Sequence, residues 1–149
     1  MILVTTGSSG PFEDLIRVVD NAVFKKEINE QVICQIGNGD YVPKNCEHFK
    51  FKESIDSLID EADLVITHGG TGTVTDLIRR KKRFIAVANT QLADNHQVEF
   101  LSKIASICNI TWTDNLNEIV SLIKSTEKLE PPVLQTPSLI DDLRTYLKG

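Results

Sequence analysis

The sequence predicts an α/β fold in which a parallel β-sheet carries helices on both faces. The first observation behind this prediction is that short apolar runs alternate with segments whose apolar residues recur at helical spacing. The second is that these runs end in polar or glycine-containing loops. The third is size and composition: 149 residues, 41% hydrophobic and 25% charged, suit one globular domain with a real core.

Six apolar runs are expected to form the strands of this sheet. They cover residues 2–5, 31–36, 48–51, 64–67, 84–88 and 110–113. Five helices are expected between and after them because apolar residues recur every three or four positions. The helical stripes are Phe12, Leu15, Ile16, Val19 and Val23; Ile55, Leu58, Ile59 and Ala62, with Ser54 as a cap; residues 74–80 after a glycine turn; Val98, Leu101 and Ala105 within 95–106; and Leu116, Ile119, Val120 and Ile123.

A glycine turn between the fourth strand and the third helix is the most informative feature of the chain. Residues 62–76 read as a strand, then Gly-Gly-Thr-Gly-Thr, then a helix start. This order places free backbone N–H groups and the positive end of a helix dipole at one point, which suits a phosphate. The glycines have no Cβ to keep an anion away, and Thr71 and Thr73 add hydroxyl donors. Asp76, about one turn into the helix, could accept hydrogen bonds from a ribose.

We therefore predict a nucleotide-diphosphate site, and the alternative is a tight turn that needs glycine only for its geometry. The turn is not a complete dinucleotide-binding fingerprint, because Thr75 stands where the third glycine belongs. No Gly-x-x-x-x-Gly-Lys-Ser/Thr motif occurs, which excludes a P-loop NTPase. The net charge of −5 argues against nucleic-acid binding.

Four polar loops follow strands of the predicted sheet, at residues 6–11, 37–40, 68–73 and 89–97. Because ligands of parallel sheets bind at the carboxyl ends of the strands, these loops favour one binding site at that edge. In the last loop Asp94, Asn95, His96 and Gln97 stand together at a helix start. Such amides and an imidazole can bind sugar hydroxyls, while the simpler alternative is an Asp94 cap followed by exposed first-turn residues.

We expect no metal at this site. A cluster of Asp94, His96 and His68 is the weaker alternative, and no Asp-x-Asp motif is available to hold a divalent cation on a sugar nucleotide. A helix N-terminus could neutralise the diphosphate instead. Catalysis by His96 is less favoured than ligand contact, since no serine or cysteine nucleophile is evidently paired with it.

The cysteines and the chain ends suggest a soluble cytoplasmic protein. Cys34, Cys46 and Cys108 are odd in number and lack Cys-x-x-Cys spacing, so we expect free thiols in a reducing compartment. Neither a signal peptide nor an apolar run of about 20 residues is expected.

The chain divides, by prediction, into a domain at residues 1–127 and a Pro-containing connector with a C-terminal helix at residues 128–149. Leu139, Ile140, Leu143 and Leu147 form an apolar stripe in the second part. The stripe is expected to pack either on its own domain or against a partner subunit. A basic run at residues 79–83 is expected to be a solvated helix end, with attraction to anionic lipid as the alternative.

Two motifs carry a family resemblance: Ala-Asp-Leu-Val-Ile-Thr-His-Gly-Gly-Thr-Gly-Thr at residues 62–73 and Asp-Asn-His-Gln-Val-Glu at residues 94–99. With Val-Thr-Thr-Gly at residues 4–7 and Gln-Ile-Gly-Asn-Gly at residues 35–39, they resemble the C-terminal, donor-binding half of family 28 glycosyltransferases. Within that family the chain is most similar to the free-standing Alg13, PssE and EpsF type. The resemblance covers residues 1 to about 123 and implies a Rossmann-like domain, the C-terminal half of a GT-B fold.

The resemblance also implies a UDP-sugar site without a metal or other cofactor. Asp76 stands where the family usually has a ribose-binding glutamate, one methylene longer. By position, the implied contacts are Thr6, Gly7, Gly70, Thr71, Gly72 and Thr73 for the diphosphate, Asp76 for the ribose, Phe51 and Lys52 for the uracil, and Asn95, His96 and Gln97 for the sugar.

The activity implied is transfer of a hexose or N-acetylhexosamine from a UDP-sugar to a lipid-linked acceptor, in polysaccharide or lipid-linked oligosaccharide synthesis. Within these 149 residues we expect no room for an acceptor domain. A membrane-anchored Alg14- or PssD-like subunit would therefore supply the acceptor half and the catalytic base and recruit the chain to the membrane. Two alternatives stay open: a non-catalytic enhancer subunit, and a stand-alone nucleotide-sugar enzyme such as an epimerase, for which only His68 and His96 are candidate catalytic groups.

Overall fold

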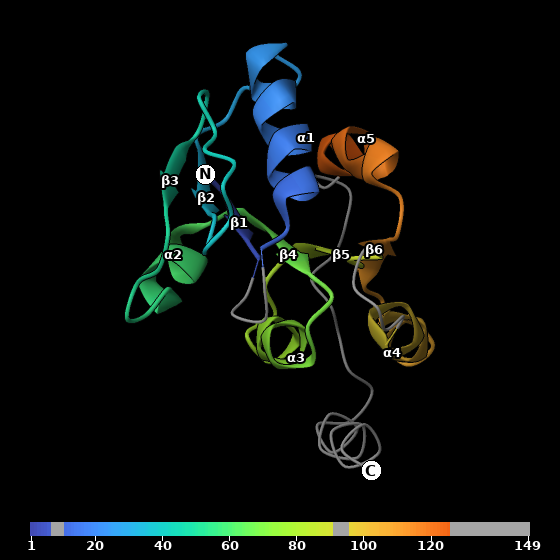
Figure 1. The fold of residues 1–149 in the computed structure, drawn as a ribbon. Helices are drawn as coiled ribbons and strands as arrows, with labels where there is room; N and C mark the ends of the chain where they lie inside the picture. The colour runs from blue at the N-terminus through green and yellow to red at the C-terminus, as the bar shows by residue number, and fades with distance from the viewer. Residues whose placement is uncertain (7–10, 91–95, 126–149) are drawn as a thin grey trace.

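The computed structural model describes residues 1–6, 11–90 and 96–125 (Figure 1). Its centre is a six-stranded, wholly parallel sheet in the order β3-β2-β1-β4-β5-β6. The strands are β1 Ile2–Thr5, β2 Val32–Gln35, β3 Glu47–Phe49, β4 Leu64–His68, β5 Phe84–Val87 and β6 Thr111–Thr113. The predicted α/β class is confirmed, and the strand order is that of a doubly wound Rossmann-like sheet.

Helices cover both faces of this sheet. The helices are α1 Glu13–Phe24, α2 Asp56–Glu61, α3 Thr71–Arg79, α4 His96–Ala105 and α5 Ile119–Ser125, with a 3₁₀ turn, η1, at Leu116–Glu118. In Figure 1, α1 and α5 lie above the sheet, and α3 and α4 lie below it. Helices α1, α2, α3 and α4 each lie between two strands in the chain, because neighbouring parallel strands need a crossover connection of about a dozen residues or more.

Two apolar clusters, one on each face, hold the layers together. Along β1, Ile2 and Val4 face the α1 side and Leu3 faces the other, because successive side chains of a strand point to opposite faces. The α1 side is filled by that helix's stripe and by Ile119 of α5. The opposite side is filled by residues of α2, α3 and α4, among them Ile59, Leu77, Phe100, Leu101 and Ile104.

Two details of the predicted helices differ from the structure. Ala105 was expected to face inward but is exposed, because the buried stripe of α4 runs through Phe100, Leu101 and Ile104 instead. Ile55, not Ser54, is the N-cap of α2. The Ser54 hydroxyl still accepts a hydrogen bond from the Asp56 N–H at 3.2 Å, from one position further upstream.

The basic run after α3 is partly engaged in contacts with α2. The Arg80 guanidinium makes ion pairs with Asp60 at 3.3 Å and with Asp56, and Lys82 Nζ donates to the carbonyl of Ala62 at 2.7 Å. These two cations therefore fasten α3 to α2. Attraction of the other basic side chains of this run to anionic lipid stays a prediction.

None of the described helices combines the length and the apolar character needed to cross a bilayer. The three cysteines are free thiols, as predicted. The boundary predicted at residue 127 and the apolar stripe beyond it lie outside the described residues.

Candidate functional site

The carboxyl ends of four strands meet at one edge of the sheet. Thr5 of β1 is in register with Gln35 of β2 and with Thr67 of β4, and His68 of β4 is in register with Val87 of β5. The loops that follow these strands are the ones that the sequence predicted to converge. This edge, including the β1–β4 position where the strand order reverses, is where open α/β sheets bind ligands.

The glycine turn forms a helix start without a side-chain cap. Gly70 is the N-cap of α3, and the first helical hydrogen bond runs from Val74 N to Gly70 O at 3.0 Å. The N–H groups of Thr71, Gly72 and Thr73 precede that bond, so they have no helical acceptor. Within the described part of the chain no side chain caps them, and the first turn of α3 holds no acidic residue. The predicted strand, glycine turn and helix are therefore confirmed, and the resulting helix start is open to an anion.

The three glycines of the turn serve different purposes. A Cβ on Gly70 would overlap Nε2 of His68, and one on Gly69 would lie 3.0 Å from Leu101 Cδ1. These two positions need glycine for packing, which is the geometric alternative stated above. A Cβ on Gly72 would meet nothing within 4 Å. Gly72 therefore faces open space at the helix start.

His68 lies beneath this turn. Its side chain is 6% exposed, and its Nδ1 is 3.3 Å from the Thr67 hydroxyl. Burial lowers the pKa of His68 from its ordinary value of 6.5, because desolvation disfavours the imidazolium. The ring is therefore neutral at pH 7.

Gln97 joins two loops of the site. Its Oε1 accepts hydrogen bonds from Asn89 N at 2.8 Å and from Gly69 N at 3.3 Å. The amide oxygen thus ties the end of β5 to the glycine turn and leaves the NH₂ group for a ligand. His96, in contrast, is exposed and lies 3.8 Å from Glu99. Asn95 is outside the described residues, and the sugar-binding role of all three stays a prediction.

Asp76, the residue predicted to bind the ribose, already has a protein partner. Asp76 Oδ2 accepts a hydrogen bond from Arg80 Nε at 3.0 Å, one turn further along α3. A ribose hydroxyl would have to share this carboxylate with the guanidinium. The ribose contact therefore stays a prediction, now with a competing ion pair.

The predicted base-binding residues lie at the β2 side of the same edge. Phe51 is 53% exposed, and its ring edge is 3.7 Å from the position that a Cβ on Gly37 would take. Gly37 has φ of +62°, a conformation that favours glycine. Lys52 Nζ lies 4.8 Å from the Phe49 ring centroid instead of beside Phe51. An exposed aromatic face is thus available here for stacking.

Thr6, predicted as a diphosphate contact, is buried at the end of β1. Its hydroxyl donates to the carbonyl of Gln35 at 3.1 Å. The oxygen of that hydroxyl can still accept a hydrogen bond, but its proton is in use. Gly7, the other predicted contact of this loop, lies outside the described residues.

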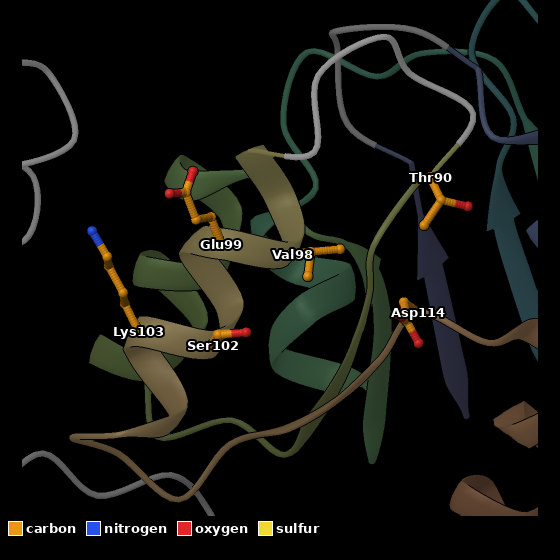
Figure 2. Close-up of a pocket in the computed structure, with 6 residues that line it drawn as sticks. All are labelled: Thr90, Val98, Glu99, Ser102, Lys103 and Asp114. Atoms are coloured by element: carbon orange, nitrogen blue, oxygen red, sulfur yellow. The ribbon is translucent and has the colours of Figure 1, made fainter.

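Two adjoining pockets extend the edge beyond β5, and sequence reasoning did not identify them. One, of about 680 Å³, lies between α4 and the ends of β5 and β6, and the other, of about 360 Å³, reaches toward α1. Figure 2 shows the first, with Thr90 and Asp114 on the side opposite α4. It is lined by Thr90, Val98, Glu99, Ser102, Lys103 and Asp114. The two pockets share Thr90 and Asp114, and the polar pair Asp114-Asn115 after the last strand was the available signal.

The described residues contain no group of three or more His, Cys, Asp or Glu side chains that could hold a metal ion. His68 is buried and His96 exposed, so these two candidates lie in different environments. Asp94, the third member of the alternative cluster, is outside the described residues.

Several sequence relatives of this chain carry the same name. It is 35% identical over 144 residues to the UDP-N-acetylglucosamine transferase subunit ALG13 of Saccharomyces cerevisiae, covering 87% of this chain and 69% of the relative. It is 31% identical to the human protein of that name over 69% of this chain, and to that of Yarrowia lipolytica over 70%. The matched part spans only 10% of the human protein and 60% of the Yarrowia protein.

Solved structures show the same fold. A solution NMR structure of ALG13 matches with a TM-score of 0.63 and 24% identity, covering 99% of this chain and 96% of the other. Acinetobacter baumannii MurG matches with a TM-score of 0.59 and 20% identity, and this chain corresponds to 41% of its length. The chain thus has the fold of one Rossmann-like part of that longer protein. Because the profile of the glycosyltransferase family 28 C-terminal domain matches residues 1–137, the chain belongs to that family, as the motifs of the glycine turn and of residues 94–99 indicated.

Proposed function

We propose that this chain is the donor-binding subunit of a two-component glycosyltransferase that transfers a hexose or N-acetylhexosamine from a UDP-sugar to a lipid-linked acceptor. The observation that carries the proposal is the uncapped start of α3, with Gly72 facing open space. The family and the relatives named as UDP-N-acetylglucosamine transferase subunits support a UDP-sugar donor, and among donors they favour UDP-N-acetylglucosamine. The proposed pathway is lipid-linked oligosaccharide or exopolysaccharide synthesis.

In the proposed reaction the N–H groups of Thr71, Gly72 and Thr73 hold the diphosphate. An acceptor hydroxyl oxygen bonds to the anomeric carbon of the sugar as the bond from that carbon to the UDP oxygen breaks, and the hydroxyl proton passes to the base proposed on the partner subunit. Negative charge then gathers on the departing diphosphate, where the N–H groups and the helix dipole stabilise it. No metal is required for this step, because the helix start supplies the positive potential.

The other predicted contacts arrange the donor along the edge. The exposed face of Phe51 would stack on the uracil, and Asp76 would share its carboxylate between Arg80 and a ribose hydroxyl. The NH₂ group of Gln97 is the part of that side chain left to the sugar. The catalytic base is proposed to come from the partner subunit.

Titration of the isolated chain with UDP tests the donor site. Calorimetry is expected to show binding of both UDP and UDP-N-acetylglucosamine, and amide NMR should place the largest shifts at residues 70–73. ADP, which differs from UDP in its nucleobase, serves as the control for recognition of the uracil. A chain that binds neither uridine nucleotide, yet raises the activity of its partner, would be the enhancer of the alternative hypothesis.

We further propose that the chain acts at the cytoplasmic face of a membrane, held there by an anchored Alg14- or PssD-like partner. The name "subunit" of the relatives supports a partner, and the stripe that the sequence predicts from Leu139, Ile140, Leu143 and Leu147 is the segment proposed to bind it. Truncation after Pro132 should reduce co-sedimentation with membranes when the partner is co-expressed and should leave UDP affinity unchanged. Equal sedimentation of the truncated and full-length chains would remove this stripe as the tether.

A further inference from the structure

The buried imidazole of His68 presents one ring nitrogen to the glycine turn. The side chain is only 6% exposed, and Nε2 is the atom that a Cβ on Gly70 would overlap. Among the residues that the structure describes, Nε2 has no hydrogen-bond partner. Within the described residues, this ring nitrogen and the N–H groups of Thr71, Gly72 and Thr73 therefore have no protein partner. Nε2 keeps some contact with solvent, because no fully buried side-chain nitrogen or oxygen in that part of the chain lacks a hydrogen bond.

The other ring nitrogen has a partner that selects the tautomer. Nδ1 lies 3.3 Å from Oγ1 of Thr67, which is fully buried in β4. That contact is the only hydrogen bond that the Thr67 hydroxyl makes to the described residues. Because a buried hydroxyl proton without an acceptor is costly, the hydroxyl donates to Nδ1. In a neutral imidazole the single N–H then sits on Nε2 and points toward the turn.

We propose that Thr67 is a positioning residue, whose hydroxyl holds His68 in the Nε2–H tautomer so that this N–H donates to a phosphate oxygen of a nucleoside diphosphate at the start of α3. The inference rests on the proposed function for the identity of the ligand. In the opposite tautomer Nε2 would present a lone pair to the phosphate, which repels an anion. The hydroxyl of Thr67 therefore decides whether His68 attracts or opposes the diphosphate, without touching the ligand.

The pair Thr67→Val and Thr67→Ser tests this role. Valine keeps the shape of threonine and removes the hydroxyl, whereas serine keeps the hydroxyl. Long-range ¹H–¹⁵N spectra of the histidine rings report the tautomer, and calorimetry reports the affinity for UDP. The wild type and Thr67→Ser should show His68 protonated on Nε2. Thr67→Val should shift the ring toward the Nδ1–H form and weaken UDP binding about tenfold, as expected when a hydrogen bond to a charged group is lost.

A second variant separates this role from packing. His68→Phe keeps a ring and removes both nitrogens, so it should weaken UDP binding by a similar factor. In the His68→Phe background, Thr67→Val should then cause no further loss, because the hydroxyl acts through the histidine. An additional tenfold loss in that background would show that Thr67 acts independently and would overturn the proposal.

Other results overturn the inference in distinguishable ways. An Nδ1–H tautomer of His68 in the wild-type protein overturns it without any variant. Wild-type UDP affinity in a folded Thr67→Val chain overturns it while the proposed function survives. Absence of UDP binding in the wild type, with the Nε2–H tautomer present, contradicts the proposed function itself and removes the diphosphate as the acceptor of this N–H.

Discussion

Two helices begin at the same edge of the sheet, and their first turns are occupied in opposite ways. The first turn of α1 carries Glu13 and Asp14, and Glu13 Oε1 accepts hydrogen bonds from the backbone N–H groups of Asp40 and Tyr41. The first turn of α3 carries no acid, and no side chain of the described residues caps it. Negative charge built into the protein would repel a diphosphate at α1, whereas nothing comparable opposes it at α3.

The carboxylates of α1 hold the loop between β2 and β3. Asp20, buried in α1, accepts hydrogen bonds from the Tyr41 hydroxyl at 2.6 Å, Asn45 N at 2.8 Å and Lys44 N at 3.2 Å. Burial raises the pKa of Asp20, but these hydrogen bonds outweigh it and leave the pKa below its ordinary value of 3.8. The carboxylates of α1 therefore stabilise the fold, whereas the backbone N–H groups at the start of α3 remain available to a ligand.

The largest expected effect comes from making α3 resemble α1. Gly72→Asp places a carboxylate at the open helix start without a steric clash, since a Cβ there meets nothing within 4 Å. UDP affinity should fall about a hundredfold, because hydrogen bonds to a charged group contribute about 1.5–3 kcal/mol each. Calorimetry measures the loss. The free energy of unfolding should rise slightly, since an acid in the first turn stabilises a helix by about 0.3–1 kcal/mol.

Gly72→Asn is the matched control for that experiment, because it adds the same volume without the charge. It should lose less affinity than Gly72→Asp. Equal affinities of both variants and the wild type would show that no anion binds at α3. Gly70 is unsuitable for this purpose, since any side chain there displaces His68 and perturbs the turn itself.

The next effect concerns the α1 side. Asp20→Asn removes the charge that the three hydrogen-bond donors share, and we expect the free energy of unfolding to fall by about 1–3 kcal/mol. Urea denaturation measures this change. UDP affinity of the folded variant should stay at the wild-type value, because α1 is not the ligand-binding helix start. Asp40→Asn, an exposed position on the same loop, should change stability by less than about 0.5 kcal/mol.

A smaller effect is the pH dependence of the free energy of unfolding, to which His68 below α3 and Asp20 in α1 contribute in different pH ranges. The pKa of His68 is lowered in the folded state, so the unfolded chain binds more protons once the pH falls below the ordinary value of 6.5. Stability from this group is therefore complete above about pH 6.5 and is lost as the pH falls toward the lowered pKa, by about 1.4 kcal/mol per unit of pKa difference. Asp20 follows the same sign at lower pH, below its ordinary value of 3.8.

Urea midpoints measured from about pH 7.5 to about pH 5 test this assignment. His68→Gln should reduce the pH dependence in that window. A slope identical to that of the wild type would mean that His68 does not titrate differently in the folded and unfolded states.

The last prediction is that removal of divalent metal ions has no effect on activity. If the start of α3 neutralises the diphosphate, EDTA should leave the activity of the assembled complex unchanged. A strict requirement for Mn²⁺ or Mg²⁺, restored by adding the ion back, would show that the dipole and the N–H groups are insufficient alone.

Local sequence patterns were sufficient for the order of the elements and for the glycine turn. Strand alternation and helical spacing depend on neighbouring residues, so the six strands and five helices were predicted to within a few positions. The face of α4 was less well defined, because Val98, Leu101 and Ala105 also lie three or four positions apart. Burial of Phe100 and Ile104 decided that face in the folded chain.

The sequence by itself therefore determined the α/β class, the turn that opens α3 and the family, since these depend on order and spacing along the chain. Only the tertiary structure decided which groups of the site are already engaged. Gln97 meets Gly69 across 28 positions, and Arg80 meets Asp56 across 24. The tertiary structure also showed that Gly70 is needed for packing against His68, whereas Gly72 faces open space. Such contacts join segments that are distant in sequence, so their geometry exists only after the layers of the sheet have packed.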